Sequence, residues 1–176
     1  PRRHSSAASD VYKRQPTTPG WFVLNTKPPA NYADWDAMVA ALTDRVLNTY
    51  MIDNAYFEIW NEPDLGSWTG TSAEYFELYE RTYDAIKSVD PQVPVGGPAT
   101  NHWAKNINYQ QPYGYITNSI ADLSLIGQLI DSTTAWNKPL DFISWHNFNL
   151  EHQTNENAIA YITQKYAGLG SAVPEL

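Results

Sequence analysis

The chain has 176 residues, of which 43% are hydrophobic and 14% aromatic, and it contains no cysteine. This bulk excludes general disorder and is enough for one domain with a core, while the lack of cysteine excludes a disulfide framework and a thiolate metal site. No run approaches the ~20 apolar residues of a membrane span, and acidic residues exceed basic ones by 19 to 11, so we expect neither a membrane span nor a nucleic-acid partner.

Residues 1–15 (PRRHSSAASDVYKRQ) have no hydrophobic periodicity and hold four of the eleven basic residues. No apolar segment follows their positive charges, so they do not predict a signal peptide. Residues 10–15 resemble the translation of an adapter used in sequencing libraries. We interpret 1–15 as a non-native leader and 16–176 as the gene product; a native basic tail is the alternative. On this interpretation the true start is missing, and the sequence does not indicate an extracellular or a cytoplasmic location.

The first elements after the leader alternate between strand and helix. A short apolar run predicts a strand over Trp21–Leu24. Asn31, with Asp34 three residues later, predicts the start of a helix, and the apolar positions of that helix are Trp35, Met38, Val39, Leu42 and Val46. The run Tyr56–Trp60 predicts a strand that stops at 61–64.

Thr71 and Glu74 form a capping-box pair that opens the clearest helix, which Asp90-Pro91 ends. The apolar face of this helix comprises Tyr75, Leu78, Tyr79, Ala85, Ile86 and Val89. Val93–Val95 predicts a brief strand running into Gly96-Gly97-Pro98. Apolar spacing then predicts one further helix, with Ile116, Ile120, Leu123, Ile126 and Ile130 on its apolar face.

Phe142–Trp145 reads as a buried strand, and the helix after it is expected to open at Asn155 or Glu156 and close at Gly168 and Gly170. That helix carries Ile159, Ile162 and Tyr166, and a fifth strand begins near Val173. Strict strand–helix alternation predicts a parallel sheet, as in a doubly wound sheet or a barrel. No strand is followed by the glycine fingerprint of a nucleotide-binding sheet.

Polar and aromatic residues follow three of the predicted strands: Asn61-Glu62, Asn101-His102-Trp103 and His146-Asn147. Both architectures place their sites at these carboxyl ends. Glu62 is the strongest candidate, because a carboxyl beside an apolar strand loses water on one side, which suits a general acid. Asn61 offers a donor and an acceptor to a hydroxyl group. The alternative is a turn that caps the loop.

The segment 57–65 (FEIWNEPDL) resembles the fourth-strand signature of clan A glycoside hydrolases, which are (β/α)₈ barrels. Residues 95–99 (VGGPA) narrow the resemblance to family 39, and 141–146 (DFISWH) is similar to that family's sixth-strand segment. Three ordered motifs on consecutive strands make the resemblance specific. Phe148 departs from it, since the family often has tyrosine there.

The resemblance implies an incomplete α/β (β/α)₈ barrel that spans about strands three to six and the start of strand seven. It implies that Glu62 is the acid/base and that Asn61 binds the sugar beside the scissile bond. The nucleophile would follow strand seven, beyond the chain end. Glu175 lies at the start of that strand, so we do not expect it to be the nucleophile.

Other candidate site residues have a structural alternative. His146 is predicted to bind a sugar hydroxyl or to tune Glu62, and Trp145, Trp68 and Trp103 to stack on sugar rings, where the alternative for each is packing. Gly96 and Gly97 suggest a close backbone approach to substrate or a simple turn. The histidines lack a metal-ligand pattern, so we expect neither a metal ion nor a cofactor.

The sequence therefore predicts that the parent protein is a retaining, β-xylosidase-like glycoside hydrolase acting on an oligosaccharide or glycoside. The alternatives are another clan A endo-glycanase, similar to family 5, or a non-catalytic carbohydrate-binding pseudo-enzyme. These 176 residues alone are expected to be inactive and poorly soluble, because half of the carboxylate pair and half of the barrel are absent. The sequence does not predict the oligomeric state.

Overall fold

The computed structural model describes residues 26–107, 118–147 and 152–176. The leader 1–15, the predicted strand Trp21–Leu24 and the departure at Phe148 lie outside these residues. The described elements, in chain order, are α2 (Tyr32–Asp44), the π-helical turn η2 (Arg45–Thr49), β1 (Phe57–Glu58), α3 (Ser72–Val89), β2 (Val95–Thr100), the 3₁₀ helix η3 (Asn118–Leu123), α4 (Leu125–Ala135), β3 (Phe142–Trp145) and α5 (His152–Leu169).

The three strands form a parallel sheet in the order β1-β2-β3. A parallel bridge between Phe142 and Glu175 extends this order beyond β3, as expected from the fifth strand predicted near Val173. The order of the described strands along the sheet therefore follows their order along the chain. A doubly wound sheet reverses this order at a switch point, and the described strands contain no such reversal.

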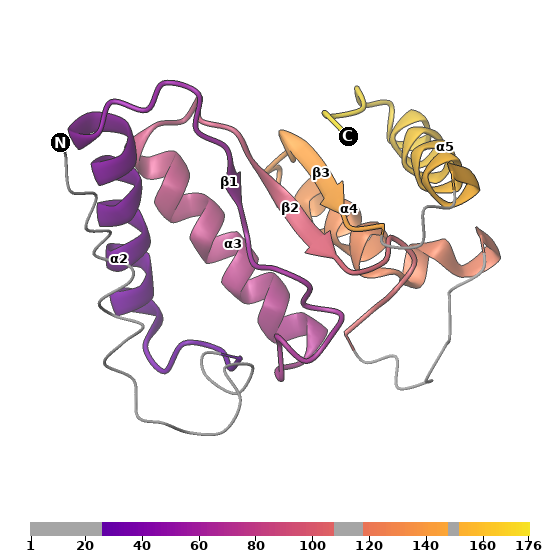
Figure 1. The fold of residues 1–176 in the computed structure, drawn as a ribbon, viewed down its shortest axis with the longest axis horizontal. Coiled ribbons are helices and arrows are strands. Elements are labelled where there is room, and N and C mark those ends of the chain that lie inside the picture. The colour runs from indigo at the N-terminus through magenta and orange to yellow at the C-terminus, as the bar shows by residue number, and fades with distance from the viewer. Residues whose placement is uncertain (1–25, 108–117, 148–151) are drawn as a thin grey trace, which may run out of the picture.

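Helix α3 lies between α2 and the sheet (Figure 1) and begins as predicted. The Thr71 hydroxyl accepts from the Glu74 backbone, and the Glu74 carboxylate accepts from the Thr71 backbone. Helix α3 buries Tyr75, Leu78, Tyr79, Thr82, Tyr83, Ala85 and Ile86. The Tyr75 hydroxyl donates to the Ile59 carbonyl at 3.1 Å, which fixes α3 to the chain just after β1.

Helix α2 begins at the predicted cap, because the Asn31 side chain accepts from the Ala33 backbone. The predicted apolar face is wrong in part: Met38 and Leu42 are 53% and 55% exposed. The exposure of Met38 and Leu42 goes with polar contacts between α2 and α3. Asp36 pairs with Arg81, and the Trp35 indole donates to the Thr82 hydroxyl, so the helix turns the neighbouring positions, including buried Val39 and Thr43, towards α3.

A single helix was predicted to carry Ile116, Ile120, Leu123, Ile126 and Ile130. Ile116 lies outside the described residues, and the remainder forms two helices, η3 and α4. The buried Ser124 hydroxyl accepts from the Gly127 backbone at 2.9 Å and caps α4 after η3 ends. Ile126 and Ile130 are buried as predicted, whereas Leu123 is 56% exposed. The spacing of apolar residues does not reveal this break, because Ser124 falls between two apolar positions.

Strand β1 is shorter than predicted, and strand β2 is longer. Strand β1 ends at Glu58 and β2 continues through Gly96-Gly97-Pro98 to Thr100. A Cβ atom on Gly96 would lie 2.3 Å from the carbonyl oxygen of Phe142. Close packing of β2 against β3 thus requires this glycine, which lies within a strand and is not a simple turn.

Helix α5 begins at His152, before the predicted start at Asn155 or Glu156, and it includes Gly168. Gly170 follows with φ 66°, the left-handed conformation typical of a residue after a helix end. Ile162 and Tyr166 are buried and Ile159 is 45% exposed. Within the described ranges, no helix is both long and apolar enough to span a bilayer.

Candidate active site at the strand ends

The loop after β1 is held in a sharply turned conformation. Trp60 and Glu62 have φ values of 75° and 47°, in a region where side-chain-bearing residues are uncommon. The Ser67 hydroxyl lies 2.6 Å from the carbonyl oxygens of both Asn61 and Glu62, and the Trp60 indole donates to the Ser67 carbonyl. These contacts close the loop on itself and set the direction in which the Glu62 side chain leaves.

The end of β2 fixes the backbone of Glu62. The pairing of β2 with β3 shifts register between Pro98 and Thr100, and Ala99 there has φ 50°. The Ala99 carbonyl accepts from the Glu62 backbone at 2.8 Å, while the Ala99 backbone donates to the Ser144 hydroxyl at 3.2 Å. A bulge of this kind redirects groups at a strand end. Here it ties Glu62 to β2 and, through β2, to β3.

The Glu62 carboxyl group receives two partners on the same oxygen. Nδ1 of His146 lies 2.8 Å from Oε1, and Nδ2 of Asn101 donates to Oε1 at 3.2 Å. The Glu62 and His146 side chains are 20% and 34% exposed. The predicted proximity of His146 to Glu62 is therefore present, and residues at the ends of all three strands meet at one carboxyl group.

Asn101 links this carboxyl group to a second layer. Its side-chain oxygen accepts from the Lys105 ammonium at 3.1 Å, and its backbone donates to the Asp64 carboxylate at 2.8 Å. Asp64 also accepts from the His102 backbone at 3.3 Å. The loop after β1 and the loop after β2 are thus joined twice, by Asp64 and by Glu62.

Burial raises the pKa of Asp64. The three backbone donors, at Asn101, Asp64 itself and His102, and the positive charge of Lys105 oppose this shift without cancelling it. Loss of water around the carboxylate therefore outweighs its hydrogen bonds. The backbone groups that Asp64 binds, at Asn101 and His102 in the loop after β2, indicate a structural clamp.

Two of the tryptophans proposed to stack on sugar rings are core residues. Trp68 and Trp103 are each 3% exposed. Trp68 packs edge-on against Trp60 and Tyr75, and Trp103 lies against Tyr161. With so little exposed surface, neither ring presents a face to a ligand in this structure, so the packing alternative describes both of them.

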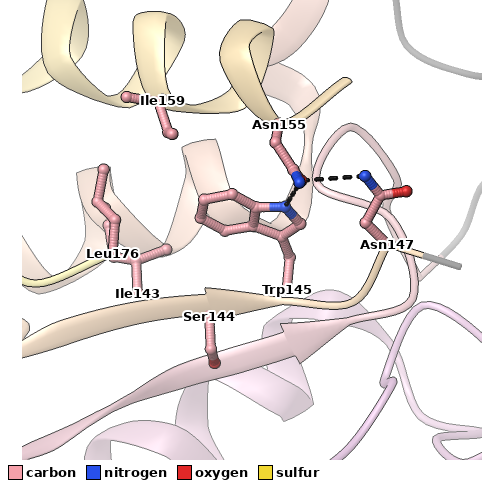
Figure 2. Close-up of a pocket in the computed structure, with 7 residues that line it drawn as sticks. All are labelled: Ile143, Ser144, Trp145, Asn147, Asn155, Ile159 and Leu176. Atoms are coloured by element: carbon pink, nitrogen blue, oxygen red, sulfur yellow. Dashed lines mark hydrogen bonds between the residues drawn. The ribbon is translucent and has the colours of Figure 1, made fainter. Parts of the chain in front are cut away.

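Trp145 lies on the α5 side of β3, whereas the next residue, His146, reaches Glu62 (Figure 2). The indole donates to the Asn155 side-chain oxygen, which also accepts from Asn147. Trp145 and these asparagines line a pocket of about 390 Å³ together with Ile143, Ser144, Ile159 and Leu176. Trp145 is thus separated from the carboxyl cluster by the strand that carries it.

Glu175 lies at the opposite end of the sheet from Glu62. It pairs with Phe142, the first residue of β3, and the Tyr56 hydroxyl donates to its carboxylate at 3.3 Å. His146, which contacts Glu62, follows the last residue of β3. At ~3.3 Å per residue, the length of β3 alone exceeds the ~5–5.5 Å of a retaining carboxylate pair.

Asn61 is exposed beside Glu62, with its carbonyl held by Ser67. Across 26–107, 118–147 and 152–176, no three side chains of His, Asp or Glu gather as metal ligands. The sequence interpretation placed Asn101 at a strand end without giving it a role, and it missed Asp64, Lys105 and Ser67 as members of the site. The signal for Asn101 is its position directly after a strand. Ser67 and Asp64 bind backbone groups, and Lys105 binds Asn101, so the residue types of these three do not reveal that they belong to the site.

Comparison with known proteins assigns the chain to a family. The sequence model described as glycosyl hydrolases family 39 matches residues 14–171. A β-xylosidase of Caldicellulosiruptor saccharolyticus is 34% identical over 140 residues, which are 76% of this chain and 25% of that protein. A β-xylosidase of Geobacillus stearothermophilus is 41% identical over 80 residues, 43% of this chain and 16% of that protein. The chain thus spans a quarter or less of these relatives' lengths.

Solved structures show a similar fold. A glucosidase from Croceicoccus marinus matches with a TM-score of 0.50 and 24% identity over 69% of this chain and 23% of its own. N2152 from Neocallimastix frontalis matches with a TM-score of 0.59 and 17% identity, over 82% of this chain and 31% of its own. The parallel sheet with its connecting helices is consistent with the fold of clan A glycosidases.

Proposed function

This chain belongs to glycosyl hydrolase family 39, and we propose that its parent protein is a retaining, β-xylosidase-like glycoside hydrolase in which Glu62 is the general acid/base. The observation that carries the proposal is the convergence of His146 and Asn101 on one oxygen of Glu62. A carboxyl group at the carboxyl ends of parallel strands, with one oxygen held, is suited to directed proton transfer.

The proposed chemistry uses the other oxygen, Oε2, to exchange the proton with substrate. In the first step the proton moves from Oε2 to the glycosidic oxygen as the C1–O bond breaks and a carboxylate nucleophile bonds to C1. In the second step Oε2 takes a proton from water, whose oxygen attacks C1 and releases the nucleophile. His146 holds Oε1 of Glu62 in place, and exposed Asn61 binds a sugar hydroxyl.

The second carboxylate is proposed to come from a part of the parent protein outside this sequence. Glu175 is unsuitable because it lies at the opposite end of the sheet. We further propose that the described strands are consecutive members of a (β/α)₈ barrel. The sequential strand order supports this proposal, and so does the convergence of polar groups at the strand ends.

The test is Glu62→Gln in the full-length parent, assayed on xylosides with different leaving groups. Loss of general acid/base assistance lowers the rate by about 10²–10⁴-fold on xylobiose. On 2,4-dinitrophenyl xyloside the first step needs no proton, so a burst of nitrophenolate is expected, and azide, which needs no general base, restores turnover. Exposed Glu77 on α3 provides the matched control, since Glu77→Gln removes the same charge from a helix position near Tyr32 of α2.

Near-normal turnover of xylobiose by Glu62→Gln overturns the assignment of Glu62. Wild-type activity on long polysaccharides with none on short xylosides favours the endo-glycanase alternative. Binding of xylo-oligosaccharides without any turnover by the wild-type parent favours a carbohydrate-binding pseudo-enzyme.

A further inference from the structure

We propose that Asn101 is a positioning residue that decides which oxygen of Glu62 exchanges its proton with substrate, and that Lys105 sets the orientation of the Asn101 amide. The inference rests on the proposed function of Glu62 and extends it to two residues of the loop after β2. It is carried by three contacts of Asn101, to Lys105, Asp64 and Glu62.

The orientation of the amide follows from the chemistry of its neighbour. An ammonium group only donates hydrogen bonds, so the atom of Asn101 that lies 3.1 Å from Lys105 Nζ is the oxygen. The NH₂ group then points to Oε1 of Glu62, at 3.2 Å. The ionised Glu62 carboxylate only accepts hydrogen bonds and favours the same orientation. A protonated Glu62 could donate to a flipped amide, and Lys105 opposes that flip by holding the amide oxygen.

The backbone of Asn101 is fixed independently of its side chain. Asp64 accepts from the backbone of Asn101 at 2.8 Å and from that of His102 at 3.3 Å. The loop is thereby anchored to the segment that carries Glu62 itself. The donor and the carboxyl group it orients therefore move together, which preserves their geometry when substrate enters.

Two partners on Oε1, the donating Asn101 amide and Nδ1 of His146, leave Oε2 as the oxygen that exchanges its proton with substrate. An Oε1 that accepts from Asn101 and contacts His146 is a poor site for that proton, because protonation there would displace a partner. The charged and titratable groups that surround Glu62 are His146 from the end of β3, Asp64 from its own loop and Lys105 through Asn101. Asn101, unlike these groups, carries no charge. Its hydrogen bond orients the Glu62 carboxyl group without changing the net charge around it.

The test is Asn101→Ala in the full-length parent, with kcat measured on xylosides of graded leaving-group basicity. On xylobiose or an alkyl xyloside, kcat is expected to fall by about 10–100-fold, part of the range of general-acid assistance, with KM little changed. On 2,4-dinitrophenyl xyloside the bond-breaking step is expected to change less than threefold, because that leaving group departs unprotonated. Lys105→Met is expected to give the same pattern with a smaller loss.

The matched control is Asn106→Ala, in the same loop. Asn106 binds Ser72 at the start of α3 and the Leu123 carbonyl, so its loss disturbs the loop without touching Glu62. An equal loss on all leaving groups, or the same pattern in Asn106→Ala, overturns the positioning role and indicates general loop damage. An unchanged kcat in Asn101→Ala also overturns it. If Glu62→Gln keeps full activity as well, the proposed function fails with it; if only Asn101→Ala is silent, the proposed function stands.

Discussion

Helix α3 and the cluster at the strand ends are built by different means. Every buried side chain of α3 sits on a regular helix with a capping box at its start. At the strand ends, three residues with side chains, Trp60, Glu62 and Ala99, adopt positive φ, and each such conformation costs about 1–3 kcal/mol. The helix is stabilised by burial of apolar surface. The cluster is held by a hydrogen bond that Ser67 donates and by others that Asp64 and Ser144 accept.

This contrast indicates that the residues that stabilise the fold and the residues that form the candidate site lie in different parts of the molecule. The core beneath α3 tolerates no loss of volume, because its largest side chains are fully buried. The strand ends instead keep polar groups partly exposed and oriented, an arrangement that a ligand site requires. Substitutions in the two regions should therefore differ in whether they affect folding or the geometry of the site.

The largest effect on stability is expected from Leu78→Ala in α3. Leu78 is fully buried, so its truncation should lower the free energy of unfolding by about 2–5 kcal/mol. Chemical denaturation of the parent protein measures the loss, with Leu65→Ala as control. Leu65 is 42% exposed in the loop after β1, and its truncation should cost about 0.5 kcal/mol. Equal losses in the two variants would contradict the contrast between core and loop.

A smaller effect is expected from Asp64→Asn, which weakens the clamp on Asn101 and His102. Removal of the charged acceptor should cost about 1–3 kcal/mol. Since burial raises the pKa of Asp64 above its ordinary value of 3.8, the folded state binds its proton more tightly than the unfolded chain. The stability that this group contributes is therefore complete below pH 3.8 and is lost as pH rises through the raised value.

The free energy of unfolding is measured for wild type and Asp64→Asn at a series of pH values, from below 3.8 to the pH at which Asp64 is ionised in the folded protein. The difference between the two proteins should narrow as pH rises and become constant once Asp64 is ionised in both states. A difference that widens with rising pH would show that hydrogen bonds to the carboxylate, rather than burial, dominate at this site.

The smallest effect is expected from Thr71→Ala at the start of α3. Loss of the hydroxyl that accepts from the Glu74 backbone should cost about 1 kcal/mol. Thr71→Ser keeps the hydroxyl and should remain close to wild type in thermal unfolding. Wild-type stability in Thr71→Ala would mean that packing alone fixes the start of α3 and that the capping box is redundant.

Sequence patterns predicted the regular region well. The capping box of Thr71 and Glu74, the end of α3 at Asp90 and the strand Phe142–Trp145 are confirmed, because each depends on neighbouring residues in the chain. The buried face of α2 was predicted only in part: Val39 is buried, whereas Met38 and Leu42 are exposed, and the helix also meets α3 through the polar contact between Asp36 and Arg81. Apolar periodicity carries no information about such a contact.

At the strand ends, the sequence located Glu62 and His146 and could not predict what joins them. The roles of Ser67, Asp64 and Asn101 depend on a positive φ at Glu62 and on a bulge at Ala99, and no local propensity favours either. For the tryptophans, the residue type suggested a role in the site that their position in the fold does not support. Trp68 and Trp103 are suitable for sugar stacking by type, yet their position in the fold buries them.

The sequential order of the sheet bears on how the protein is synthesised. Among the described strands, β2 hydrogen-bonds to β1, β3 to β2, and the segment at Glu175 to β3. Each strand leaving the ribosome therefore meets a partner that has already been made, and each closure spans a single strand–helix unit, which keeps its entropic cost low. The sheet can grow at one edge while translation continues, so the loop that carries Glu62 is bounded by paired backbone before His146 has been translated.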